Sequence, residues 1–277
     1  MNAITVSGLN KTFSRRHPVK ALNQASFTVR EGSITGFLGP NGAGKSTTMD
    51  ILLGFINKTA GEAKIFDQTV DVNSITTRRN IGFLTNDFAL DKTFTVAEEL
   101  EYLGRLSRKF DLEYSQSLAK RLNLNWRAKI GDLSTGNYQK VALISALQHQ
   151  PKLLILDEPT NGLDPLVQAE FNQIIRELNR AGTTVFISSH ILSEVSELCD
   201  NFIFIKNGHI VANLTKDEID AQSSQFITVK PTREQRTKLL DFLKHAKIEY
   251  NIEAGDLSQT FMQFYDQDSN RNGGKNA

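Results

Sequence analysis

Gly39-Pro40-Asn41-Gly42-Ala43-Gly44-Lys45-Ser46-Thr47 is the stretch that decides the fold of this chain. It matches the pattern G-x-x-x-x-G-K-S/T without a mismatch. Because glycines lack a Cβ, the backbone N–H groups of such a loop can turn inward around a phosphate. A helix that begins at Lys45 would add its unpaired amides and the positive end of its dipole. Since Lys45 can reach the β- and γ-phosphates and the Ser46 hydroxyl can ligate Mg²⁺, the stretch predicts a nucleoside triphosphate site.

The sequence on either side of the loop supports the same prediction. Residues 33–38 are mostly apolar and read as a buried strand that runs into the loop. Residues 47–53 carry Met49, Leu52 and Leu53 at helical spacing. A Gly-rich turn that binds nothing would not need this strand–loop–helix context.

Composition limits the classes to which the chain can belong. It has 277 residues with a formal net charge of +1, which suits one large domain plus an appendage and gives no support for a nucleic-acid partner. The single cysteine, Cys199, cannot form an internal disulfide, in agreement with a reducing compartment. No apolar run approaches the length of a membrane span, and residues 1–6 lack a signal-peptide pattern. We therefore expect a soluble chain that would depend on other chains for any membrane span.

Strands and helices alternate along most of the chain. We expect paired strands at 4–9 and 25–29, followed by strands at 63–66, 81–84, 153–156, 184–187, 202–205 and 209–211. Helices are expected at 96–110, 114–122, 134–147, 166–180 and 191–198. This order predicts an α/β fold with a phosphate-loop parallel-sheet core, an N-terminal antiparallel β subdomain and an inserted helical subdomain at about 96–133.

The pattern changes near residue 215, so we expect residues 1–215 to form the main domain. Residues 216–265 read as a small C-terminal α+β appendage, with strands at 226–229 and 248–252 and helices at 231–246 and 257–265. Residues 266–277 are polar and rich in Asn and Gly, which is typical of a disordered tail.

An acidic pair ends the apolar run at 153–156. Asp157, expected at the carboxyl end of a buried strand, can hold a Mg²⁺ shell. Glu158 can accept a proton from an attacking water. Together with Lys45, the pair fits many nucleotide hydrolases.

Three further features narrow that choice. Residues 133–137 read Leu-Ser-Thr-Gly-Asn at a predicted helix start, where Ser134 and the following amides form a second anion site. One chain needs two such sites only if a partner chain brings the other nucleotide. The other features are Asn161-Gly-Leu-Asp164 and His190, which follows a strand and can donate to a γ-phosphate.

These motifs and their order resemble the nucleotide-binding subunits of ATP-binding cassette (ABC) transporters, over about residues 2–215. The resemblance implies a head-to-tail dimer that closes on two ATP molecules with Mg²⁺. Each ATP would lie between the phosphate loop of one copy and Ser134 and Gly136 of the other. Glu158 and His190 would be the catalytic residues. Phe13 matches the aromatic residue that stacks on adenine in this family, although the sequence alone allows a place in the core.

The chain departs from the family pattern at three positions. Thr135 stands for the first glycine of the signature Leu-Ser-Gly-Gly-Gln, and Asn137 stands for its glutamine. Asn86 stands for the glutamine that follows the strand at 81–84 and approaches the metal or water. Since Lys45, Ser46, Asp157, Glu158 and His190 are intact, we still expect hydrolysis of ATP.

The expected function is an ATP-binding and ATP-hydrolysing subunit that powers a separate multi-span permease from the cytoplasmic face of the cell membrane. The C-terminal region resembles that of single-cassette exporter subunits of the bacteriocin, antibiotic and multidrug type, so the expected direction is export. The loop at 86–95 and the helices after Val96 are the expected permease contact. The cargo would be chosen by the permease.

Two alternatives remain open at this point. The altered signature is compatible with a regulatory or immunity cassette that binds ATP and barely hydrolyses it. A non-transport cassette ATPase is the other, although ribosome-acting members carry two cassettes and this chain has one phosphate loop.

Overall fold

The computed structural model describes residues 1–14, 17–73, 81–107, 110–223 and 231–246. The chain divides into two compact units, residues 1–218 and 219–277. Helix α8 (Lys216–Ser223) begins in the first unit, and α9 (Arg233–His245) belongs to the second. The strands predicted at 226–229 and 248–252, the helix at 257–265 and the disordered tail at 266–277 lie outside the described residues.

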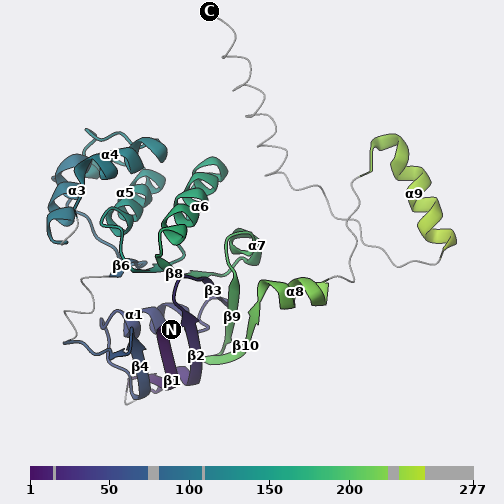
Figure 1. Cartoon of the computed structure of the whole chain (residues 1–277), viewed down its shortest axis with the longest axis horizontal. Helices are drawn as coiled ribbons and strands as arrows, with labels where there is room; N and C mark the ends of the chain where they lie inside the picture. The colour runs from purple at the N-terminus through teal and green to yellow at the C-terminus, as the bar shows by residue number, and fades with distance from the viewer. Residues whose placement is uncertain (15–16, 74–80, 108–109, 224–230, 247–277) are drawn as a thin grey trace, which may run out of the picture. The chain divides into compact units, whose positions relative to one another are not determined.

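Two sheets form the first unit (Figure 1). The antiparallel sheet has the order β2-β1-β4-β5, with β1 (Asn2–Phe13), β2 (Val19–Arg30), β4 (Ala60–Ile65) and β5 (Gln68–Thr69). The larger sheet has the order β10-β9-β3-β8-β7-β6, with β3 (Ile34–Leu38), β6 (Ile81–Leu84), β7 (Leu153–Asp157), β8 (Thr184–Ser189), β9 (Asn201–Lys206) and β10 (His209–Thr215). It is parallel except for β10, so the predicted fold class is confirmed.

The strand order of the larger sheet brings three chain segments to one edge. In the parallel register, Leu38 at the end of β3 pairs with Ser189 of β8. Asp157 at the end of β7 pairs with Ser188. The phosphate loop, the acidic pair and the segment before His190 therefore leave the sheet side by side.

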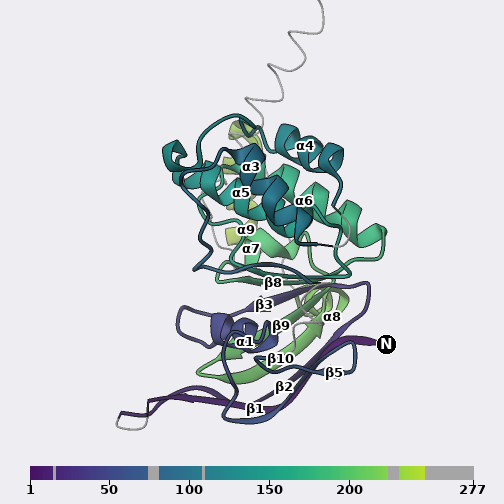
Figure 2. The ribbon, with the colours of Figure 1, turned by 90° about the vertical axis from the view of Figure 1, so that its left-hand side faces the viewer.

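The main apolar core lies between the two sheets and includes helix α1 (Lys45–Leu52). Figure 2 shows α1 on the side of the antiparallel sheet and helices α3 to α6 on the opposite side of β3 and β8. Three aromatic rings connect the layers, because Phe186 of β8 lies 5.7 Å from Phe27 of β2 and 5.2 Å from Phe37 of β3, measured between ring centroids.

Replacing Phe186 with alanine should lower the free energy of unfolding by about 3–5 kcal/mol, because the fully buried ring would leave a cavity between the sheets. Urea unfolding followed by circular dichroism measures this loss. Phe242→Ala is the matched control, since Phe242 is largely exposed on α9. A loss below about 1 kcal/mol for Phe186→Ala would contradict this placement of the core.

The helical part consists of α3 (Val96–Arg105), α4 (Leu112–Arg121) and α5 (Thr135–Leu147). A buried hydrogen-bonded group joins them: the Ser115 hydroxyl of α4 donates to Gln148 Oε1, and Gln148 Nε2 donates to the Leu100 carbonyl of α3. Arg121 of α4 also forms ion pairs with Glu170 and Glu177 of α6 (Pro165–Arg180). These contacts join α3, α4 and α6 and hold the C-terminal end of α5, where Gln148 lies.

The prediction of one helix over 96–110 was wrong, since α3 ends at Arg105. Both the Ser107 amide and its hydroxyl donate to the Gly104 carbonyl, which closes a tight turn. The Phe110 ring packs so closely on Gly104 that a Cβ there would lie 2.1 Å from it. The helical spacing of apolar residues continues in the sequence through Leu106 and Phe110, but in the structure the chain leaves the helix before Phe110. The helix predicted at 191–198 is also shorter, as α7 (Leu192–Ser196).

Candidate functional site

The phosphate loop turns sharply between β3 and α1. Gly42 and Gly44 have φ of 77° and 110°, which favours glycine, and a Cβ on Gly44 would lie 2.7 Å from the Ala21 carbonyl oxygen. Helix α1 begins at Lys45, as predicted, and no side chain caps it. No acidic residue occupies its first turn. The amides of that turn therefore suit an anion, which agrees with the predicted phosphate site.

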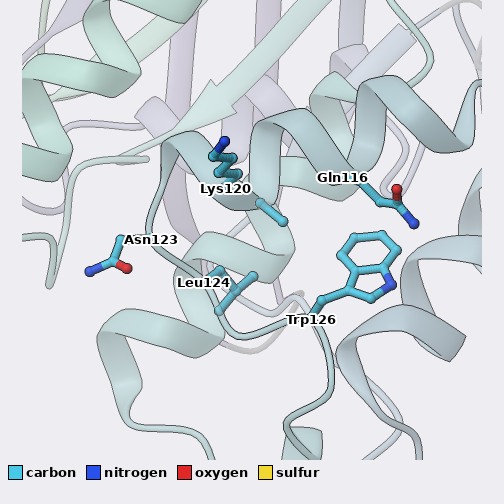
Figure 3. Close-up of a pocket in the computed structure, with 6 residues that line it drawn as sticks. Gln116, Lys120, Asn123, Leu124 and Trp126 are labelled. Atoms are coloured by element: carbon cyan, nitrogen blue, oxygen red, sulfur yellow. The ribbon is translucent and has the colours of Figure 1, made fainter.

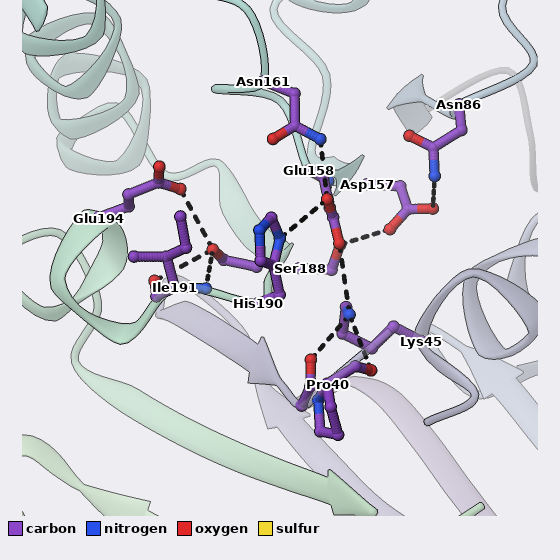
Figure 4. Close-up of polar contacts among 12 residues, drawn as sticks. Pro40, Lys45, Asn86, Asp157, Glu158, Asn161, Ser188, His190, Ile191 and Glu194 are labelled. Atoms are coloured by element: carbon purple, nitrogen blue, oxygen red, sulfur yellow. Dashed lines mark hydrogen bonds and ion pairs between the residues drawn. The ribbon is translucent and has the colours of Figure 1, made fainter. Parts of the chain in front are cut away.

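Lys45 lies across the loop that precedes it. Its side chain is 5% exposed, and Nζ donates to the carbonyls of Gly39 (2.8 Å) and Pro40 (3.4 Å). The same Nζ lies 3.3 Å from Glu158 Oε1. The ammonium group thus already holds one anionic partner, the Glu158 carboxylate (Figure 4).

Glu158 is the centre of the site, and Figure 4 shows Lys45, Asn161 and His190 pointing toward its carboxylate. Oε2 accepts from Asn161 Nδ2 at 2.8 Å and lies 3.1 Å from His190 Nδ1. Burial raises the pKa of Glu158, but the hydrogen bonds from Asn161 and Lys45 outweigh it and hold the pKa below its usual value. The carboxylate is therefore ionised at neutral pH and able to accept a proton.

Asp157 is 2% exposed at the end of β7. Its Oδ2 accepts from Asn86 Nδ2 at 3.1 Å, and its Oδ1 accepts from the Ser188 hydroxyl. The sequence does not point to a role for Ser188, because its only signal is its pairing with Asp157 on the neighbouring strand. The sequence does not point to Asp50 of α1 either, although Asp50 lies close enough to Asp157 to feel its charge. Burial raises the pKa of Asp50 most, and the negative charges of Asp157 and Asp87 raise it further.

The donors near Lys45 fit Mg²⁺. Ser46 presents an exposed hydroxyl directly after Lys45, and Asp157 supplies a carboxylate. Both are the oxygen ligands that Mg²⁺ prefers. No group of three or more His, Cys, Asp or Glu side chains that could hold a metal ion occurs among the described residues. Mg²⁺ in nucleotide sites is typically bound through one or two carboxylates together with waters and substrate phosphates.

The remaining predicted site residues lie apart from this cluster. Ser134 caps α5 by accepting the Asn137 amide at 3.4 Å, and a Cβ on Gly136 would lie 2.9 Å from the Gly162 carbonyl oxygen. Phe13 is 40% exposed at the end of β1, with Lys11 Nζ 4.7 Å above its ring. Within the described ranges, no hydrogen bond or ion pair joins Phe13, Ser134 or Gly136 to Lys45 or Glu158.

A hollow of about 420 Å³ lies on the helical part and contains none of the predicted site residues. Figure 3 shows its lining, which comes from α4 and the segment after it: Gln116, Ala119, Lys120, Asn123, Leu124 and Trp126. The phosphate loop is instead an open surface, where Asn41, Gly42 and Ser46 are exposed. No described helix is long and apolar enough to cross a membrane.

Comparison with known proteins agrees with this geometry. The sequence profile of the ABC transporter family matches residues 22–161. The Nod factor export ATP-binding protein I of Rhizobium sp. (strain N33) is 37% identical over 216 residues, which is 76% of this chain and 70% of that protein. The bacitracin transport ATP-binding protein BcrA of Bacillus licheniformis is 32% identical over 240 residues, which is 86% and 78% of the two chains.

A solved structure supports the same assignment. The dimeric, post-hydrolysis ATP-binding cassette MJ0796, bound to ADP and Pi, matches with a TM-score of 0.71 at 26% identity and covers 77% of this chain and 98% of that one. The profile match, the relatives and the shared fold show that the chain belongs to the ABC transporter family, as an ATP-binding subunit that hydrolyses ATP.

Proposed function

We propose that this chain is the ATP-driven subunit of an exporter and acts on a separate multi-span permease at the cytoplasmic face of the cell membrane. The main support for the proposal is that Lys45, Asp157, Glu158 and His190 lie together at the carboxyl ends of the parallel strands. Export is supported by the relatives, one of which is described for Nod factor export and another for bacitracin transport.

Each residue of the cluster has a distinct role in this proposal. Lys45 and the amides of residues 42–47 bind the β- and γ-phosphates, which replace Glu158 beside the Lys45 ammonium group. Ser46, Asp157 and Asn86 would hold Mg²⁺, whose charge neutralises the phosphate oxygens. Glu158 then accepts a proton from the attacking water.

His190 is the second catalytic residue of the proposal. Its Nδ1 lies 3.1 Å from the Glu158 carboxylate, and its side chain remains partly exposed. The imidazole can therefore orient Glu158 while it turns its other nitrogen toward the γ-phosphate. Phe13, with its exposed ring, would stack on the adenine.

The site is completed by a second copy in this proposal. Among the described residues, neither Ser134 nor Gly136 hydrogen-bonds to Lys45, Glu158 or His190 of its own chain, and Ser134 is exposed at the start of α5. The amides at a helix start suit the γ-phosphate of a nucleotide held by another chain. A head-to-tail pair would thus contain two composite sites.

Mixing two inactive variants tests the composite site. Lys45→Ala removes the phosphate lysine, and Ser134→Arg blocks the signature. Mixed dimers keep one intact site, so a 1:1 mixture should recover about a quarter of the wild-type rate, because half of the pairs are mixed and each has one intact site. The rate of phosphate release from ATP measures the activity that the mixture recovers. A mixture no more active than either variant alone would contradict the composite site.

The altered signature gives a further prediction. The Thr135 side chain is β-branched and exposed where a phosphate would approach, so it should crowd closure of the dimer. Thr135→Gly combined with Asn137→Gln should raise ATP turnover severalfold. Asn57→Gln, at an exposed position outside the site, is the control. An unchanged or lower rate in the double variant would show that the departures do not slow the enzyme.

The permease contact is proposed at the loop 86–95 and helix α3. Tyr102 and Leu106 are 55% and 68% exposed, and the Phe94 ring lies 6.3 Å from the Tyr102 ring. The Tyr138 hydroxyl accepts from the Leu90 amide at 2.7 Å and donates to the Phe88 carbonyl. Tyr138 thus anchors the loop that follows Asn86, and Asn86 in turn contacts Asp157 of the site.

A further inference from the structure

A fully buried hydroxyl at the end of β8 joins the two acidic residues of the site. The Ser188 hydroxyl donates to Asp157 Oδ1 and accepts the backbone N–H of Glu158 at 3.0 Å (Figure 4). We propose that Ser188 is a positioning residue for ATP hydrolysis, which orients the Asp157 carboxylate toward the metal and fixes the backbone that carries Glu158. This inference rests on the proposed roles of Asp157 and Glu158.

The direction of both hydrogen bonds follows from the groups involved. A backbone N–H can only donate, so the Ser188 oxygen must accept from Glu158. A hydroxyl has a single proton, which is then free for Asp157 Oδ1. The two bonds use the proton and one lone pair of the same oxygen, so they coexist and orient each other.

The Asp157 carboxylate depends on this hydroxyl for its orientation. At 2% exposure it has little contact with bulk water, and its protein donors in the described residues are Ser188 on Oδ1 and Asn86 on Oδ2. A carboxylate held from both oxygens cannot rotate about its Cβ–Cγ bond. Outer partners of this kind determine how well a ligand meets its metal.

Glu158 depends on Ser188 through its backbone. Its φ of 47° lies in the left-handed region, which is unfavourable for a residue with a Cβ. The bond from its N–H to Ser188 holds the peptide in that conformation. The conformation in turn directs the carboxylate toward Lys45, Asn161 and His190. Loss of the bond would let the peptide relax and shift the proton acceptor, and small displacements of this kind slow catalysis strongly.

Two variants of the full-length chain test the proposal. Ser188→Ala removes both bonds, and Ser188→Cys fills similar space with a weak donor and a weak acceptor. The control is Ser115→Ala, because Ser115 is equally buried and donates to one side chain, Gln148, in the helical part. Binding of a fluorescent ADP is titrated with Mg²⁺, and kcat and KM for ATP are measured separately.

Ser188→Ala should raise the Mg²⁺ concentration for half-maximal ADP binding by roughly tenfold, which is the typical effect of losing an outer partner of a metal ligand. Its kcat should fall by about 10- to 100-fold, with KM for ATP within about threefold of the wild type. Ser188→Cys should fall between Ala and the wild type, and it tests the proposal if Ser188→Ala does not fold. Ser115→Ala should keep the wild-type Mg²⁺ response.

A wild-type Mg²⁺ response and a wild-type kcat in both Ser188 variants would overturn the proposal. Asp157→Asn, measured beside them, shows which claim has failed. If Asp157→Asn loses the Mg²⁺ response while the Ser188 variants keep it, only the role of Ser188 is wrong. If Asp157→Asn keeps it too, the metal role of Asp157 is wrong.

Discussion

Glu158→Gln is expected to lower steady-state ATP hydrolysis by about 100-fold or more, while the protein still binds ATP. The glutamine amide keeps the shape and some of the hydrogen bonds of Glu158, but it cannot accept a proton from water. It also removes the negative partner that lies 3.3 Å from Lys45 in the wild type. Nucleotide phosphates then meet an unpaired ammonium group, so the affinity for ATP should be equal or higher.

Two measurements on the same preparation check this result. Phosphate release gives the turnover, and titration with a fluorescent ATP analogue gives the affinity. Glu197→Gln is the control, because Glu197 is an exposed carboxylate outside the cluster. Phosphate release by Glu158→Gln at a rate close to that of Glu197→Gln would remove Glu158 from the role of proton acceptor.

Lys45→Ala is expected to weaken ATP binding by about 100-fold, which corresponds to about 2.7 kcal/mol. The change deletes the buried ammonium group that would contact the β- and γ-phosphates. It also leaves the half-buried Glu158 carboxylate without its ion-pair partner, and this negative charge would then repel the phosphates. Both effects lower the affinity for ATP.

Isothermal titration calorimetry with ATP, with and without Mg²⁺, measures the affinity of Lys45→Ala. Lys64→Ala is the control, since Lys64 is more exposed and pairs with Glu62 on β4, in the other sheet. If the affinity of Lys45→Ala stays within about threefold of this control, the phosphate role of Lys45 is wrong.

Much of the fold could be predicted because its signals are local. The loop at 39–47 determines the start of α1 at Lys45, and the Ser134 cap determines the start of α5. The strand at 81–84 agrees with β6. The end of α3 could not be predicted, because it depends on the Phe110 ring packing against Gly104 after the chain has turned.

The candidate site could be predicted only in part. Lys45, Asp157, Glu158 and His190 carry motif signals, and the structure places Lys45 and His190 against the carboxylate of Glu158, which follows Asp157 at the end of β7. The contribution of Ser188 could not be predicted, because its contact with Asp157 exists only through the pairing of β8 with β7. The roles of Phe13, Ser134 and Gly136 stay predictions, since they depend on a bound nucleotide and on a second copy.

In the proposed function, ATP brings two copies of the chain together around two composite sites. Light scattering of Glu158→Gln, which should bind ATP without hydrolysing it, measures this association. At saturating ATP with Mg²⁺ we expect Glu158→Gln to have twice the 31.0 kDa mass of one chain. The double variant Lys45→Ala/Glu158→Gln should keep the mass of a single chain. A mass of 31.0 kDa for Glu158→Gln at saturating ATP would contradict the claim.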